Sequence, residues 1–151
     1  MRNGSNPHLH AKGTRASKAM LLPLPKVDAT ILSLQFHCAI EALRCGRGYP
    51  EGAQALAEMV LLTSFLADAG RGVLPLDQLN AGKAALERSV ERGKLSGNWH
   101  FDEFEFESLA AIAELHDAQL RKAPLRDWAC AFDQLERVRR ERPAVEQTGT
   151  D

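Results

Sequence analysis

The sequence contains few aromatic and few β-branched side chains. Phe, Tyr and Trp make up only 6% of its 151 residues, and alanine and leucine dominate an apolar share of 44%. Such a composition favours helix, because alanine and leucine are strong helix formers. The length suits one domain of typical size with a sizeable core. We therefore predict an all-α, single-domain fold.

Cysteines are also scarce. Cys38, Cys45 and Cys130 are an odd number, and they show no CxxC spacing. We expect reduced, mostly packed thiols in a cytoplasmic protein. Residues 20–25 (MLLPLP) form too short an apolar run for a signal peptide and contain two prolines, which argues against secretion.

Motifs that would identify an enzyme or a metal centre are missing. The sequence has no Gly-rich phosphate loop, no HExxH, no nucleophile elbow and no Cys/His zinc pattern. Glu58 and Asp68 interrupt the most apolar stretch, so it does not read as a membrane span of about 20 apolar residues. We therefore predict no catalytic residue, no bound metal, no cofactor and no membrane contact.

The most apolar stretch, residues 53–69, predicts a helix at the centre of the fold. Its apolar side chains cover nearly every direction around a helix axis, and such a helix is normally surrounded by other helices. Pro50 suits the first turn, and Gly70 suits the left-handed residue that follows a helix end. We predict a bundle of about five helices around this one, within residues 17–142.

Helical spacing and caps predict the other four helices. They run from a cap at Asp28 to about Arg44, from Pro75 or its neighbour to about Lys94, from about Asp102 to Arg121, and from Pro124 to about Glu141. Gly82 lies on an apolar stripe, which predicts close approach of a neighbouring helix.

The first of these helices has two neighbouring apolar stripes, and the two later helices each have an expected buried side. One stripe is Ile31, Leu34, Cys38, Ala42 and Cys45, and the other is Leu32, Phe36, Ala39 and Leu43. The helix that begins near Pro75 has an expected buried side that comprises Leu76, Leu79, Leu86 and Val90. The buried side of the last helix is Leu125, Trp128, Ala129, Phe132 and Leu135.

The N-terminal region is positively charged. Residues 1–27 hold five basic and no acidic groups, whereas residues 28–151 hold 14 basic and 20 acidic groups. Residues 1–16 lack periodicity and predict an extended, flexible basic arm. Residues 20–25 are expected to lie extended against the helical body, or else to dock on another molecule. Residues 143–151 are expected to be a frayed tail.

Two sets of charged residues are candidate contact sites. One could bind a protein partner or nucleic-acid phosphates, and it comprises Arg2, Lys12, Arg15, Lys18, Arg137, Arg139, Arg140 and Arg142. The other is an acidic edge, which is either a solvated face or a patch for a basic partner, and it comprises Glu103, Glu107, Glu114 and Asp117.

His116 is the one histidine on an apolar stripe. The favoured interpretation is a core histidine bonded to a backbone carbonyl or a polar side chain, because no second ligand pair at zinc-like spacing accompanies it. The other interpretation is a catalytic or metal-binding imidazole next to Asp117, assisted by His37 or His100. His37 itself is expected to face water, one turn from Glu41.

Several segments between residues 17 and 135 resemble a group of small bacterial all-helical proteins, some of which are labelled "Fis family transcriptional regulator". The segments are SKAMLLPLP, LRCGRG, LADAGRG, and ALERSVERGKLSGNW through LHDAQLRKAPL. The resemblance implies a bacterial helical protein. The chain departs from true Fis proteins because its C-terminal region shows no helix-turn-helix, so the resemblance carries over no DNA-binding residue.

Three functions stay open from the sequence. The leading hypothesis is a non-enzymatic adaptor, regulator or inhibitor that binds a macromolecular partner through a helical face. One alternative is a nucleic-acid-binding regulator that uses the basic arm and the C-terminal arginines. The other is a metal-dependent enzyme centred on His116. A leftover apolar face could also be buried in a homodimer.

Overall fold

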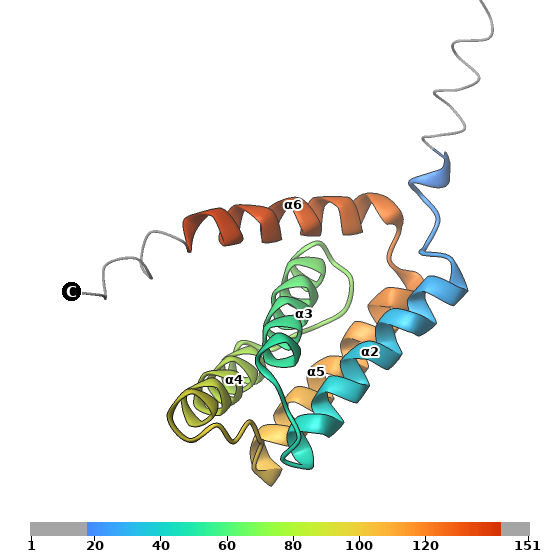
Figure 1. The fold of residues 1–151 in the computed structure, drawn as a ribbon. Helices are drawn as coiled ribbons and strands as arrows, with labels where there is room; N and C mark the ends of the chain where they lie inside the picture. The colour runs from blue at the N-terminus through green and yellow to red at the C-terminus, as the bar shows by residue number, and fades with distance from the viewer. Residues whose placement is uncertain (1–17, 143–151) are drawn as a thin grey trace, which may run out of the picture.

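The computed structural model describes residues 18–142, which form five α-helices without any strand (Figure 1). The predicted all-helical bundle is confirmed. The predicted arm, residues 1–16, and the predicted tail, residues 143–151, lie outside the described residues. The helices are α2 (Lys26–Arg44), α3 (Pro50–Asp68), α4 (Leu76–Ser96), α5 (Glu103–Lys122) and α6 (Leu125–Glu141).

Helix α3 is the centre of the bundle. It packs against α2, α4, α5 and α6, while α2 and α5 run side by side (Figure 1). Leu56, Met59 and Leu66 of α3 are completely buried. Pro50 occupies the first turn, and Gly70 has a left-handed φ of 88°. The prediction of a central helix is confirmed, including both of its end signals.

The core has two parts, one along the first half of α3 and the other along its second half. The first joins α2, α3, α4 and α5 and contains Leu43, Met59 and Ile112. The second lies where α6 crosses the bundle and contains Leu66 and Trp128. Each fully buried side chain of this size contributes roughly 1.5 to 3 kcal/mol to folding.

Helix α4 approaches α5 closely at Gly82, as predicted. A Cβ at this position would lie 2.3 Å from the Cδ1 of Ile112, so a larger residue would force the end of that side chain to move. The contact joins the first half of α4 to the middle of α5. The close packing of α4 on α5 at this position therefore offsets the low helix propensity of glycine.

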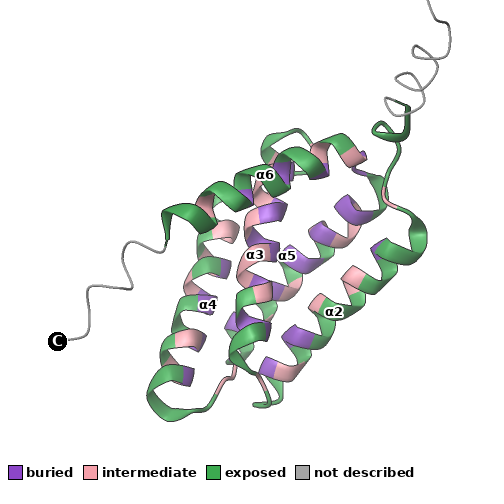
Figure 2. Ribbon diagram, turned by 45° about the horizontal axis from the view of Figure 1, so that its top comes forward, coloured by how far each residue is buried: buried purple, intermediate pink, exposed green. Residues whose placement is uncertain are grey.

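Helix α2 differs from its prediction in two ways. It begins at Lys26 after Pro25, and Asp28 lies in its first turn without capping it. Only one of its two apolar stripes is buried: Ala39 and Leu43 face the core, while Leu34 is 62% exposed. Because α3 and α5 cover one side of α2 only, the opposite stripe stays on the surface (Figure 2).

Other expected core positions are also on the surface. Leu76 is the first residue of α4 and lies beyond the helices that would cover it, and Ala129 and Phe132 of α6 are exposed because α6 packs mainly on α3. The prediction of packed thiols is wrong as well, since Cys38, Cys45 and Cys130 are exposed free cysteines.

Residues 20–24 are tied to the start of α6 through backbone atoms. The Leu125 N–H donates to the Leu22 carbonyl at 2.8 Å, and the Arg126 N–H donates to the Met20 carbonyl at 2.9 Å. Leu24 packs on the second part of the core, but Leu21 and Leu22 are more than half exposed. The segment therefore lies against the body as predicted, but its first part is not extended: the Leu21 N–H donates to the Lys18 carbonyl and the Leu22 N–H to the Ala19 carbonyl, which makes a turn. Leu21 and Leu22 are not buried.

No helix within residues 18–142 combines the length and the apolar character that crossing a lipid bilayer requires.

Candidate functional site

The outer face of α2 carries a continuous apolar stripe. Val27, Ile31 and Leu34 are 70%, 50% and 62% exposed, and Cys38 is exposed one turn further on. Their spacing of four, three and four residues places them on one side of the helix, away from the buried Ala39 and Leu43. We call Val27, Ile31, Leu34 and Cys38 the outer stripe.

The neighbours of the outer stripe are mixed, with exposed carboxylates at Asp28 and Glu41 and uncharged polar groups between them. Thr30 donates its hydroxyl to the Lys26 carbonyl, and Gln35 is an exposed amide. At the end of α2, Glu41 and Arg44 pair with each other, and the Arg44 hydrogen bond lowers the pKa of Glu41. Single exposed apolar side chains are common on protein surfaces, but several in helical register are typical of an interaction site.

A second feature joins α2 to α5 through Asp117. The Ser33 hydroxyl donates to Oδ1 of Asp117 at 2.7 Å, and His37 Nε2 lies 2.7 Å from Oδ2. The expected pairing of His37 with Glu41 is wrong, because Asp117 lies across the helix interface and Glu41 pairs with Arg44. Since Ser33 bonds to the carboxylate and not to the imidazole, the three residues are not arranged to activate a serine nucleophile.

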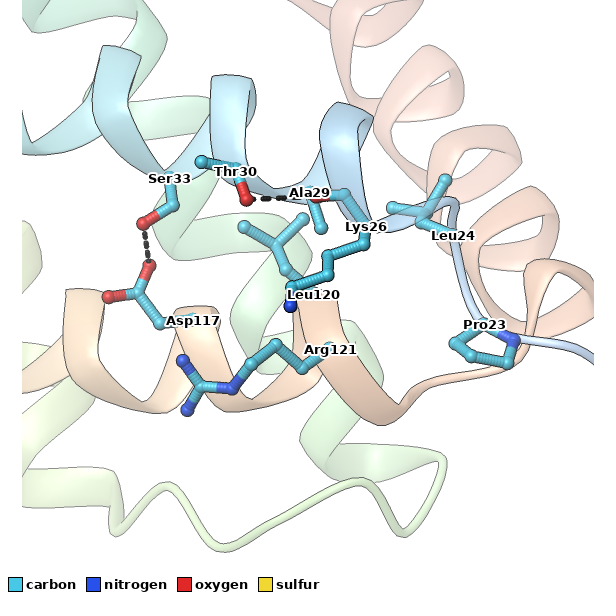
Figure 3. A pocket seen from close by; sticks show the side chains of 9 residues that line it. All are labelled: Pro23, Leu24, Lys26, Ala29, Thr30, Ser33, Asp117, Leu120 and Arg121. Carbon is cyan, nitrogen blue, oxygen red and sulfur yellow. Dashed lines mark hydrogen bonds between the residues drawn. The ribbon is translucent and has the colours of Figure 1, made fainter.

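Asp117 and Ser33 also line a cleft of about 530 Å³ (Figure 3). The other lining residues come from the segment before α2, from the start of α2 and from the end of α5, and they are Pro23, Leu24, Lys26, Ala29, Thr30, Leu120 and Arg121. Asp117 is thus partly buried between α2 and α5, whereas Glu103, Glu107 and Glu114 are exposed on α5.

Glu105 is a buried charged residue at the start of α5. It receives hydrogen bonds from Arg92 at 2.7 Å and from Arg88 at 3.1 Å, both on α4. It also completes a capping box with Asp102, whose side chain accepts from the Glu105 N–H at 2.8 Å. Burial alone would raise the pKa of Glu105, but the two arginines outweigh it and lower the pKa to about 2.

His116 lies at the junction of four helices and is 1% exposed. Its Nδ1 is 2.9 Å from the Thr63 hydroxyl, and its ring makes edge-to-face contacts with Phe36 and Trp128. Because the Thr63 hydroxyl donates to the Met59 carbonyl, it accepts from Nδ1–H. Burial lowers the pKa of His116 to about 4, so the ring is neutral at pH 7. The interpretation as a core histidine bonded to a polar side chain is confirmed.

The basic candidates are only partly brought together. Arg137, Arg139, Arg140 and Arg142 are exposed at the end of α6, and Arg139 pairs with Glu58 of α3 and with Glu136. Lys18 is exposed at the other end of the described chain, and the residues Arg2, Lys12 and Arg15 lie outside it.

Within residues 18–142, no group of three or more His, Cys, Asp or Glu side chains is placed to hold a metal ion. His116 is enclosed by aromatic rings, so its surroundings favour packing over ligand exchange. Two polar groupings were missed from the sequence: the Glu105 cluster and the Ser33–Asp117 bond. The spacing of Asp102 and Glu105 is a capping-box signature and could have identified the first.

Searches with this chain matched no protein-family model, no curated protein and no solved structure, so the resemblance stated above stays a prediction.

Proposed function

We propose that this protein is a non-enzymatic adaptor or regulator that binds a helix of a protein partner along the outer stripe of α2. The observation that carries the proposal is the stripe itself: an apolar helix face that is aligned over three turns and that no other described element covers. Apolar area in such an arrangement favours association, because burial removes it from water.

A helical partner suits the shape of this surface. The stripe from Val27 to Cys38 spans about 16 Å along a straight helix axis. A second helix can place apolar side chains at positions i, i+3, i+4 and i+7 against such a ridge. Burying the exposed part of each stripe side chain is worth roughly 1 kcal/mol.

The free cysteines support a reducing compartment for this interaction. Cys38, Cys45 and Cys130 are all exposed and unpaired, and exposed thiols persist best in the cytoplasm. We therefore infer a cytoplasmic partner.

Site-directed crosslinking at Cys38 tests the proposal. A single-cysteine variant that keeps Cys38 would carry a benzophenone maleimide, and crosslinked proteins from the native host would be identified by mass spectrometry. A matched variant that keeps only Cys130, on α6, serves as the positional control. We expect a partner that crosslinks from position 38 and not from position 130, through a peptide that lies in an amphipathic helix.

Two substitutions make this experiment specific. Leu34→Glu should abolish the crosslink, whereas Leu95→Glu, at an even more exposed leucine of α4, should leave it unchanged. A crosslink that survives Leu34→Glu would refute the outer stripe as the binding surface. A crosslink to a second copy of the chain would replace the proposed partner by a homodimer, which sedimentation would then measure.

A nucleic-acid-binding function is the second candidate. It is favoured by Arg137, Arg140 and Arg142, which are exposed near one another on the chain and form no ion pair with another residue in the range 18–142. It predicts a duplex-DNA affinity that falls steeply with salt. Arg137→Gln with Arg140→Gln should reduce that slope by roughly one per lost phosphate contact, and an unchanged slope would exclude these arginines.

A further inference from the structure

The cleft beside Asp117 has the size and the walls of a small-molecule site. Its volume of about 530 Å³ lies within the range of ligand pockets, roughly 300 to 1,000 Å³. Leu24, Ala29 and Leu120 provide apolar surface, and Pro23 forms the end wall. Pro23 is held in place by the backbone hydrogen bonds that tie Met20 and Leu22 to the start of α6.

The polar groups of the cleft are mostly already occupied. Both oxygens of Asp117 are engaged, one by Ser33 and the other by His37. Ser33 gives its hydroxyl hydrogen to Asp117, and Thr30 gives its own to the Lys26 carbonyl. Neither hydroxyl therefore has a hydrogen left for a ligand.

Two cations are the exception. Lys26 extends into the cleft from α2, and Arg121 extends into it from α5 (Figure 3). Neither forms an ion pair with another residue of the described chain. The donors that remain for a ligand in this cleft are therefore the Lys26 ammonium and the Arg121 guanidinium.

We propose that the cleft binds a small organic anion, with its carboxylate or phosphate group between Lys26 and Arg121 and its apolar part against Leu24, Ala29 and Leu120. Guanidinium groups bind planar oxyanions through two parallel hydrogen bonds, and a lysine adds a point charge. An organic cation would meet two positive charges and no unengaged carboxylate oxygen. A fully apolar ligand would remove both cations from water without a partner, which is costly.

This site is independent of the outer stripe. The cleft is lined by Lys26, Ala29, Thr30 and Ser33 of α2, whereas the stripe lies on the adjoining side of that helix and shares no residue with the cleft. Loss of partner binding in Leu34→Glu and loss of anion binding in cleft variants can therefore be measured separately.

Amide NMR on the full chain tests the proposal with four named probes. They are 2-naphthoate, 2-naphthyl phosphate, (2-naphthyl)methylammonium and inorganic phosphate. We expect the two naphthyl anions to shift the amides of Ala29, Ser33 and Leu120. The ammonium probe should cause no saturable shift, and inorganic phosphate should bind at least about tenfold more weakly because it leaves the apolar wall uncovered.

Charge variants test the role of the two cations. Lys26→Gln and Arg121→Gln should each weaken 2-naphthoate binding by about threefold to tenfold, the effect of losing one charge-assisted contact. Lys83→Gln on α4 is the matched control, because it also removes an exposed helical cation that forms no ion pair within residues 18–142, and it should leave the affinity unchanged.

A size variant tests the cavity. Thr30→Trp places an indole over the cleft from an exposed position and should abolish binding of both naphthyl anions, whereas Gln35→Trp, on the opposite side of α2, should not. Any of three results would overturn the proposal: no shift at the cleft amides, equal binding of the ammonium probe, or full affinity in both charge variants. Of the two anions, the one that binds tighter identifies the preferred head group.

Discussion

The two ends of α5 each bury a titratable side chain, and they do so in opposite ways. Near the start of the helix, Glu105 is charged and is held by Arg88 and Arg92. Near its end, His116 is neutral and is enclosed by Phe36, Trp128 and Thr63. Both pKa values are lowered, to about 2 for Glu105 and about 4 for His116. At pH 7 the carboxylate is therefore charged and the imidazole is neutral.

The difference follows from what lies within reach of each side chain. Two guanidinium groups on α4 compensate the desolvation of Glu105, so its charge is retained. At His116, burial among aromatic rings lowers the pKa by more than Asp117 and the Gln119 side chain raise it, so the proton is lost. One end of α5 is thus joined to α4 by charge, and the other is joined to α2, α3 and α6 by packing.

Removing the charge at the first end should have the largest effect. Glu105→Ala deletes the partner of two arginines and half of the capping box, and we expect it to lower the free energy of unfolding by about 3 kcal/mol. Urea denaturation measures this value. Glu103→Ala, two residues earlier but exposed, is the control and should cost less than about 0.5 kcal/mol. Equal effects of the two substitutions would show that the Glu105 cluster does not hold the helices together.

Acid should weaken the second end first. The unfolded chain takes up a proton on His116 near the ordinary pKa of 6.5, whereas the folded protein resists it down to a pKa of about 4. The stability from neutral His116 is therefore complete above pH 6.5 and is lost as the pH falls to 4, by up to roughly 3 kcal/mol. Glu105, with its ordinary pKa of 4.5 lowered to about 2, loses its contribution at lower pH, between 4.5 and 2.

His116→Phe separates these two windows. The phenyl ring keeps the edge-to-face contacts and does not titrate, so the loss of stability between pH 6.5 and 4 should largely disappear while the loss below 4.5 remains. His37→Gln is the control, because His37 and Asp117 are the other charged groups near this ring. The melting temperature of each variant, measured from pH 7 to pH 3, shows which residue causes the loss of stability. If His37→Gln instead removed the loss of stability between pH 6.5 and 4, that loss would come from the His37–Asp117 pair and not from His116.

The smallest effect is expected at Asp117. Asp117→Asn loses the charge that faces His37 but can still accept the Ser33 hydroxyl, and the site is partly open to water. We expect a loss of about 1 kcal/mol or less in chemical denaturation at pH 7. A loss as large as that of Glu105→Ala would show that the α2–α5 interface depends on this carboxylate.

Much of the fold could be predicted from the sequence. Pro50 and Gly70 bound α3, and its all-round apolar surface placed it at the centre. The glycine at position 82 predicted the close approach of a neighbouring helix, which is α5 at Ile112. The inward face of α2 could not be chosen, because both stripes are apolar and spacing alone does not say which side α5 will cover. For the same reason, the prediction that the thiols of Cys38 and Cys45 are packed was wrong.

The candidate site was harder to predict because its partners are distant in sequence. Ser33 and His37 meet Asp117 across about 80 residues. Glu105 looks like Glu103 and Glu107 in the sequence, and only the positions of Arg88 and Arg92 in the folded bundle distinguish it. The outer stripe was visible as a pattern, but its exposure was not.

The attachment of residues 20–24 to α6 has a consequence for sequence variation. The bonds are made by the carbonyls of Met20 and Leu22, and every residue has a carbonyl. The side chains of Leu21 and Leu22 can therefore change without detaching the segment, so this part of the chain can vary in surface chemistry at little cost to the fold. A proline in place of Arg126 would have the reverse effect: it would suit the first turn of α6 but lack the N–H that holds Met20.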